Sequence, residues 1–330
     1  MIPEPASGAA EYYVRSLHHY ETFTNSTAFD GWDLEYTQLS AGRYECQSKE
    51  VSLPGVQIYT ETGNVTSNQC GVAWPNSYIF ALPSRMGHEA RLNGRSWGGE
   101  IVAFRGENEY DALVPPMKLL IIAISRDILA EYLRTVEHVS EQEWLKRGML
   151  LIENPVRASS IIGGVTGLIE GCCADPSLLD HPQTRAAVRQ TTMEILAPLV
   201  VDHLVPAPIG YREFNHLQVV RRAREFVLEN IDEPLQIVDV CRALGVSRRA
   251  LQYSFQDVLN TNPNAYLRLL RLNGARRDLV TAGERPIQVK DVVARWGFWH
   301  LSRFSAEYRQ MFNELPSETL RKALRAAGRE

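Results

Sequence analysis

Two short groups of hydrogen-bonding side chains combine residue types that can read nucleotide bases. They comprise Arg248, Arg249, Gln252 and Tyr253 in one group, and His300, Ser302 and Arg303 in the other. An arginine can donate two hydrogen bonds to guanine, and a glutamine can make a two-point contact with adenine. Both groups are therefore candidates for sequence-specific contacts to double-stranded DNA.

The second group falls in a predicted helix-turn-helix at residues 289–312. Its first helix has one apolar face at the i, i+3, i+4 and i+7 spacing of Val289, Val292, Val293 and Trp296. Gly297 follows at once, where a left-handed helix end costs least without a β-carbon. In the next helix, Leu301, Phe304 and Tyr308 form an inward face. The polar group is therefore expected to face outward.

Residues 237–259 repeat this plan and carry the first group. Gly245 corresponds to Gly297 with an offset of 52, whereas Phe255 corresponds to Tyr308 with an offset of 53. The second unit therefore has one additional residue where its second helix begins. Ser247 is the predicted N-cap of the second helix in the first unit, because its hydroxyl can accept a hydrogen bond from an unpaired backbone N–H.

The segment between the two units, residues 263–283, reads as one long helix. Pro263 suits a helix start and Gly283 a helix end. A helix of this length spans roughly 30 Å, close to the ~34 Å between successive major grooves on one face of a duplex. The predicted connector could therefore place both units in neighbouring grooves.

Charge divides the chain in the same place. The net charge is −4, but residues 211–330 contain 20 Lys and Arg against 14 Asp and Glu, which leaves −10 for the remainder. A basic region can simply be solvated surface. Together with the repeated motif, it indicates a surface that contacts phosphates.

These motifs resemble the DNA-binding domain of the AraC/XylS family of bacterial transcription regulators. The resemblance covers about a third of the chain and rests on RRALQYSF, ARWGFWHLSRFSAEYRQMF and LPSETLR. Positions that fit the family pattern are Gly297, Phe298, Ser302, Phe304, Pro316 and Arg321. The chain departs from it at Ala306, where arginine is common, and at Asn313-Glu314, where glycine is common. No base-reading role is therefore carried over to position 306.

The resemblance implies a sequence-specific DNA-binding transcriptional regulator, more commonly an activator in this family, with promoter DNA and RNA polymerase as partners. It also implies a small-molecule effector bound by the N-terminal domain. Two alternatives stay open: the N-terminal domain binds a protein regulator, or it is a cupin-type enzyme fused to a DNA-binding module. The sequence contains no GxSxG, HExxH or phosphate-loop motif. We therefore predict that the chain is not an enzyme.

The N-terminal part differs in character. Short β-branched and aromatic stretches separated by turn residues fill residues 32–125, and helical spacing follows in residues 126–205. We predict an α+β chain with a cupin-like β-barrel, following helices and a C-terminal all-α domain with two helix-turn-helix units. The expected domains are residues 1–205 for effector sensing and dimerisation, a linker at 206–214, and the DNA-binding domain at 215–330. The helices after the barrel either pair two subunits into a homodimer or merely pack on the barrel.

An effector pocket would need polar anchors and apolar walls. The predicted anchors are Arg85, His88, Arg91 and Arg95, and the predicted walls are Trp74, Tyr78, Trp97 and Phe104. The competing interpretation is an ordinary aromatic core with solvated arginines. His88 is the one histidine in the part of the sequence with the clearest strand pattern, so we expect no metal and no cofactor there.

Nothing in the sequence suggests a membrane or a secretory route. The longest apolar run, near residues 117–124, is too short to span a bilayer and contains Lys118. The N-terminus has no signal-peptide pattern, and the five cysteines are scattered. These features predict a soluble cytoplasmic protein with reduced thiols.

Overall fold

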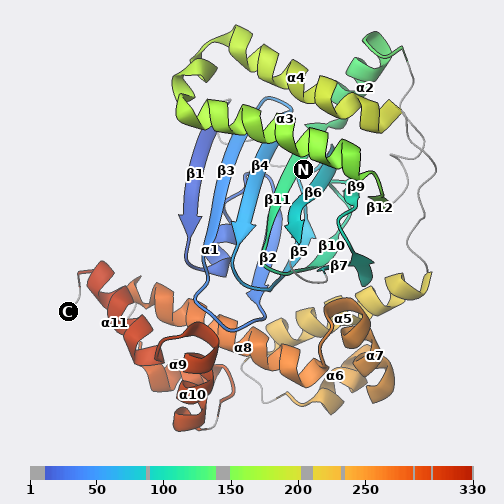
Figure 1. Ribbon diagram of the computed structural model, residues 1–330. Helices are drawn as coiled ribbons and strands as arrows, with labels where there is room; N and C mark the ends of the chain where they lie inside the picture. Colours follow the sequence, from blue (N-terminus) through green and yellow to red (C-terminus); the bar gives the residue numbers. More distant parts are fainter. Residues whose placement is uncertain are drawn as a thin grey trace, which may run out of the picture.

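The computed structural model describes residues 12–86, 90–138, 149–201, 211–231, 235–284, 287–298 and 300–328, with the backbone alone at 85–86, 211–214 and 283–284. Antiparallel strands and their covering helices form residues 12–201, here called the sheet region, and helices form residues 211–328, here called the helical region (Figure 1). The predicted α+β class is confirmed. No helix in the described ranges is long and apolar enough to cross a membrane.

The sheet region contains two antiparallel sheets. The seven-stranded sheet has the order β1 (Tyr13–His19), β3 (Cys46–Leu53), β4 (Val56–Gly63), β11 (Met117–Ser125), β6 (Ser77–Met86), β9 (Ile101–Arg105) and β12 (Leu150–Ile152). The five-stranded sheet has the order β2 (Asp33–Gln38), β5 (Ser67–Val72), β10 (Tyr110–Val114), β7 (Ala90–Leu92) and β8 (Arg95–Trp97). The strands therefore arise from the turn-separated stretches noted in the sequence.

Alternation along β4 shows how the two faces of the large sheet differ. Ile58 belongs to the hydrophobic cluster under the covering helices, whereas Tyr59 belongs to the cluster between the sheets. Successive strand residues point to opposite faces, so residues 57, 59 and 61 share the inner side. The polar residues of β4 that lie on this side are therefore buried between two sheets.

Helices cover the outer face of the seven-stranded sheet. Figure 1 shows α3 (Pro155–Ala174) and α4 (Pro182–Val201) lying across it beside α2 (Arg126–Thr135). Both α3 and α4 begin at a proline, Pro155 and Pro182, whose fixed φ suits the first position of a helix. Two short helical turns, α1 (Thr22–Ser26) and η2 (Pro176–Asp180), complete the sheet region.

The helical region has two hydrophobic cores that share one long helix. Its elements are α5 (Tyr211–Glu229), α6 (Ile237–Leu244), α7 (Arg248–Leu259), α8 (Pro263–Val280), η3 (Thr281–Glu284), α9 (Val289–Arg295), α10 (Leu301–Phe312) and α11 (Pro316–Ala326). Leu267 and Leu270, in the first half of α8, pack with α5, α6 and α7. Leu272 and Leu279, in its second half, pack with α9 and α10. Helix α8 thus joins the two predicted units, although its α-helical part ends at Val280, before residue 283.

The predicted linker, residues 206–214, overlaps the undescribed residues 202–210. Helix α5 begins at Tyr211, four residues before the predicted start of the DNA-binding domain at 215. The domain limits stay a prediction.

Candidate nucleic-acid interface

The two units, α6–α7 and α9–α10, have the same turn geometry. Gly245 and Gly297 are both left-handed, with φ of 68° and 69°. Before each first helix, a glutamine N–H donates to an aspartate carboxylate three residues later: Gln236 to Asp239 at 2.9 Å and Gln288 to Asp291 at 3.3 Å. The offset of 52 residues that relates Gly245 to Gly297 thus also relates Gln236 to Gln288 and Asp239 to Asp291.

The second helices, α7 and α10, are each 12 residues long. Phe255 and Tyr308 are fully buried at corresponding positions. Each helix ends at a left-handed asparagine, Asn260 with φ 51° and Asn313 with φ 58°. Asparagine tolerates this conformation better than most residues, which explains how Asn313 stands where the family commonly has glycine. We call α7 and α10 the reader helices.

All seven predicted DNA-contacting residues are solvent exposed. They are Arg248, Arg249, Gln252 and Tyr253 on α7, and His300, Ser302 and Arg303 at the start of α10. Arg249 Nη2 donates to the Tyr253 hydroxyl at 3.2 Å. Both groups lie on outward faces of the reader helices. Their contact with DNA stays a prediction.

A carboxylate that sequence reasoning missed lies beside the second group. Glu307 accepts hydrogen bonds from Arg303 Nε at 3.0 Å and from Arg268 Nε of α8 at 2.5 Å. Partial burial alone would raise the pKa of Glu307, but the two guanidinium groups lower that pKa overall. Arg303 is therefore held by an acid, and four-residue spacing on α10 was the available signal.

Both reader helices meet the sheet region at their C-terminal ends. Arg91 Nη1 donates to the Asp257 carbonyl near the end of α7 at 2.7 Å. The Gly42 N–H donates to the Met311 carbonyl near the end of α10 at 2.9 Å. A rearrangement of the sheet region could therefore reach both helices.

Buried ion pairs and hydrogen bonds fix the sheet region against α5 and α8. Arg224 of α5 donates to Asp111 of β10 at 3.1 Å, and Asp111 accepts from the Asn68 amide at 2.7 Å. The Tyr266 hydroxyl of α8 donates to Asn68 Oδ1 at 2.9 Å. Because these groups are buried, breaking one partner would leave the others unpaired.

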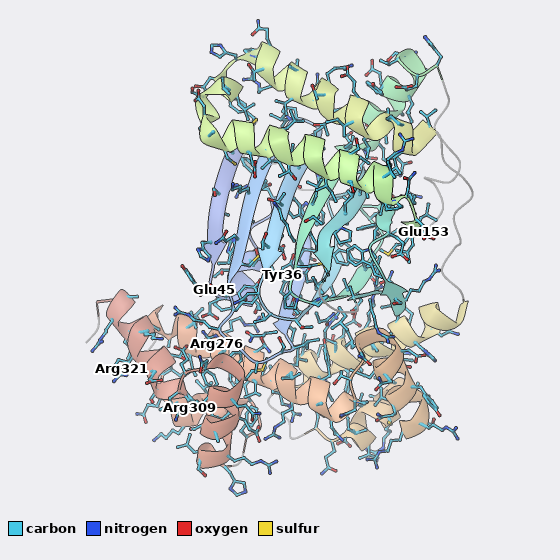
Figure 2. The ribbon with its side chains drawn as sticks, viewed as in Figure 1. Tyr36, Glu45, Glu153, Arg276, Arg309 and Arg321 are labelled. Atoms are coloured by element: carbon cyan, nitrogen blue, oxygen red, sulfur yellow. The ribbon has the colours of Figure 1, made fainter. Side chains whose placement is uncertain are left out.

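Arg276 of α8 makes a second such contact. Its guanidinium donates to both Glu21 carboxylate oxygens at 2.7 Å and to Glu314 at 2.9 Å. Figure 2 shows Arg276 where the C-terminal helices meet the strands, with Tyr36 among the strands. Arg276 therefore joins the two regions, because Glu21 belongs to the sheet region and Glu314 to the helical region.

A cavity of about 50 Å³ lies between the two sheets. Trp97 and Phe104, two of the eight predicted pocket residues, line it. Trp74 packs against the same hydrophobic cluster, but Tyr78 lies in the cluster under the covering helices. The structure therefore brings together few of the predicted walls.

Arg91 and Arg95, two of the predicted polar anchors, do not line the cavity. Arg91 contacts α7, and Arg95 begins the edge strand β8. The Arg85 side chain and His88 lie outside the described residues. No group of three potential metal ligands occurs in the described ranges. The effector residues named from the sequence stay a prediction.

The cavity instead contains a carboxylate that the sequence analysis missed. Glu61 of β4 accepts from the Tyr36 hydroxyl at 3.2 Å and from Gln69 Nε2 at 3.0 Å. Burial raises the pKa of Glu61. Its alternation with Tyr59 was the available signal, but its partners come from strands of the other sheet.

Known proteins resemble this chain over the stretch that contains the two helix-turn-helix units. A helix-turn-helix domain model matches residues 240–322. The probable thc operon regulatory protein of Rhodococcus erythropolis is 41% identical over 149 residues, which are 43% of this chain and 45% of that protein. The XylDLEGF operon transcriptional activator of Pseudomonas putida is 31% identical over 100 residues, 30% of this chain and 31% of that protein. The chain thus spans less than half the length of these curated relatives.

A solved structure of a probable AraC family transcriptional regulator from Rhodopseudomonas palustris is 34% identical, with a TM-score of 0.29. That match covers 32% of this chain and 97% of the other. Over its C-terminal third, the chain is therefore similar to helix-turn-helix transcriptional regulators.

Proposed function

We propose that the chain is a sequence-specific DNA-binding transcriptional regulator, more specifically an activator, whose two reader helices occupy successive major grooves. The observation that carries this proposal is the duplicated unit with exposed polar faces, joined by α8. The 18 residues of α8 correspond to roughly 27 Å of helix, similar to the ~34 Å between grooves. Arg249 and Arg303 are the proposed base contacts.

The proposal includes control by a small molecule bound in residues 1–205, with the linker at 206–214 and the DNA-binding domain at 215–330. Support comes from the interior cavity and from the buried contacts between the sheet and helical regions. Promoter DNA and RNA polymerase are the proposed partners, in the cytoplasm, with the chain acting as a homodimer and not as an enzyme. Curated relatives that are regulators support this reading.

Mapping the binding sites of the full chain across the genome tests the proposal. We expect a discrete set of sites, and gel-shift binding to the strongest site should fall for Arg249→Ala and for Arg303→Ala. Lys49→Ala is the charge-matched control, because Lys49 is exposed on β3. Equal binding to mapped sites and to random DNA would refute sequence-specific recognition.

A paired experiment distinguishes a small-molecule effector from a protein regulator that binds the N-terminal domain. A metabolite that raises the melting temperature of the full chain supports a small effector, because binding to the native state stabilises it. The protein regulator is favoured if the full chain captures one protein in a stoichiometric amount through residues 12–201 and no metabolite changes its melting temperature.

A further inference from the structure

The wall of the interior cavity is made of aromatic and aliphatic side chains, with one small polar group formed by Glu61 and Gln69. Six of its lining residues are aromatic: Trp32, Tyr36, Tyr59, Trp97, Phe104 and Tyr110. Glu61 contributes the carboxylate, and none of the lining residues in the described ranges is a lysine, arginine or histidine. This composition suits a cation better than an anion.

Glu61 is 5% exposed, and the hydrogen bonds shown to reach its carboxylate come from neutral donors, Tyr36 and Gln69. Glu50, the neighbouring buried acid on β3, is a useful contrast. It accepts from Tyr13 and Gln57, and Arg15 Nε lies 3.7 Å from its Oε2. Buried carboxylates are normally paired with a positive charge or neutralised by a proton. Among the buried carboxylates of the described residues, Glu50 lies beside Arg15 and Asp111 beside Arg224, whereas the hydrogen bonds to Glu61 come from neutral groups.

The aromatic rings supply a second attraction for a cation. A positive charge within ~6 Å of a ring face is stabilised by the ring quadrupole, and the effect is larger away from water. Phe29, behind the wall, stacks on Tyr59 with ring centroids 4.2 Å apart, and Trp32 meets Tyr59 edge-on at 5.7 Å. These rings are thus held in place before any ligand arrives.

The size of the cavity limits the ligand. A volume of about 50 Å³ holds roughly three to five water-sized groups, at about 10–15 Å³ each. A molecule of about five non-hydrogen atoms therefore fits without opening the sheets.

We propose that this cavity binds a small aliphatic amine as its ammonium ion, with the Glu61 carboxylate as the counter-ion and the aromatic rings around the ammonium group and its alkyl part. The proposal rests on the proposed function, for which it names the effector class. It replaces the arginine anchors suggested by the sequence, which would have favoured an acidic ligand.

The same strands connect the cavity to the helical region. On β5, Gln69 faces the cavity and binds Glu61, while the adjacent Asn68 binds Tyr266 of α8. On β10, Tyr110 and Ala112 line the cavity, while Asp111 between them binds Arg224 of α5. An amine that reorganises Gln69 and Tyr110 would therefore act directly on two buried contacts with helices α5 and α8 of the helical region.

Calorimetric titration of the full chain with three molecules of matched shape tests the proposal: isobutylamine, isobutanol and isobutyrate. We expect isobutylamine to bind saturably at one site per chain, at least tenfold more tightly than either isobutanol or isobutyrate. Equal or tighter binding of isobutyrate, or no binding of the amine, overturns the proposal.

Two isosteric variants locate the charge. Glu61→Gln should weaken isobutylamine binding by about tenfold or more, the usual loss for a hydrogen bond to a charged group. Glu50→Gln should leave it within about twofold, because Glu50 already has Arg15 and does not line the cavity. A cooperative melting transition confirms that each variant is folded, and equal affinities of the two variants overturn the assignment of Glu61.

The pH dependence gives an independent readout. Because burial raises the pKa of Glu61, its carboxylate forms only as the pH rises through that raised value, and amine affinity should increase there. Glu61→Gln should remove the increase. If the chain binds mapped DNA sites without an amine and the titrations fail, this inference alone falls. A chain that binds no specific DNA refutes the proposed function instead.

Discussion

The two helix-turn-helix units share a backbone frame but differ in the side chains placed on it. In both, a glutamine–aspartate cap precedes the first helix, a left-handed glycine makes the turn and a left-handed asparagine ends the second helix. Ser247 caps α7 by accepting from the Ala250 N–H at 3.1 Å, whereas His300 at the corresponding place makes no side-chain cap bond. The residues that shape the unit are therefore alike in the two copies, whereas the exposed residues differ.

The charged surroundings differ as well. In the second unit, Glu307 accepts hydrogen bonds from both Arg303 and Arg268. The position in the first unit that corresponds to Glu307 is the buried Ser254, which donates to the Ala250 carbonyl. Arg249 instead contacts the Tyr253 hydroxyl. Arg303 must give up its contact with the Glu307 carboxylate before its guanidinium can bind a nucleotide base. We therefore expect the first unit to contribute more to DNA affinity.

The largest expected effect tests whether the two cores are separate. Phe255→Ala and Phe304→Ala each remove a fully buried ring and should each cost about 3–5 kcal/mol. Because the rings belong to different clusters, Phe255→Ala should accelerate hydrogen exchange mainly in α6 and α7, and Phe304→Ala mainly in α9 and α10. Equal acceleration in both units by either variant would show a single cooperative core.

The next effect concerns DNA. Arg249→Ala and Arg303→Ala should each weaken specific binding by about 1–3 kcal/mol, with Arg249 at the upper end because Arg303 must leave Glu307. Fluorescence anisotropy on the mapped site and on a scrambled duplex measures this. Equal losses on both duplexes would make the arginine a phosphate contact, and a larger loss for Arg303 would reverse the ranking.

A smaller effect separates the two helix starts. Ser247→Ala should destabilise the chain by about 1 kcal/mol, the typical cost of losing an N-cap side chain. His300→Ala should change the free energy of unfolding by only a few tenths, because its side chain makes no cap bond. Urea denaturation of both variants makes the comparison, and equal losses would contradict the difference in capping.

The smallest effect is a pH dependence confined to the second unit. Two arginines lower the pKa of Glu307 below its ordinary 4.5, although burial opposes them. Its contribution to stability is therefore present above the unfolded-state pKa and is lost as the pH falls through the lowered value. Glu307→Gln should be less stable than the parent at neutral pH by a few tenths of a kcal/mol. That gap should close on acidification, and a gap that widens would contradict the sign.

Local spacing made the helical region predictable. The turn glycines, the Ser247 cap and the change of offset from 52 to 53 depend on residues a few positions apart, and the structure has each of them. The buried arginines were harder, because a sequence does not distinguish them from surface arginines. Arg224 pairs with an acid 113 residues away and Arg276 with one 255 residues away.

The interior cavity was less predictable for a related reason. Alternation in β4 places Tyr59 and Glu61 on one face, but it does not tell which strands of the second sheet lie opposite. Tyr36 and Gln69 reach Glu61 only through the packing of two sheets. Arg91 was expected in a pocket and instead contacts α7, because the strand that carries it lies against that helix.

Hydroxyl-radical footprinting of the full chain on a mapped site tests the central claim that both reader helices bind one duplex together. We predict two protected patches on one face of the duplex, about one helical turn of roughly 10 base pairs apart. Arg249→Ala should weaken protection of one patch and Arg303→Ala that of the other. A single protected patch, or protection that both substitutions weaken at the same nucleotides, would contradict the account.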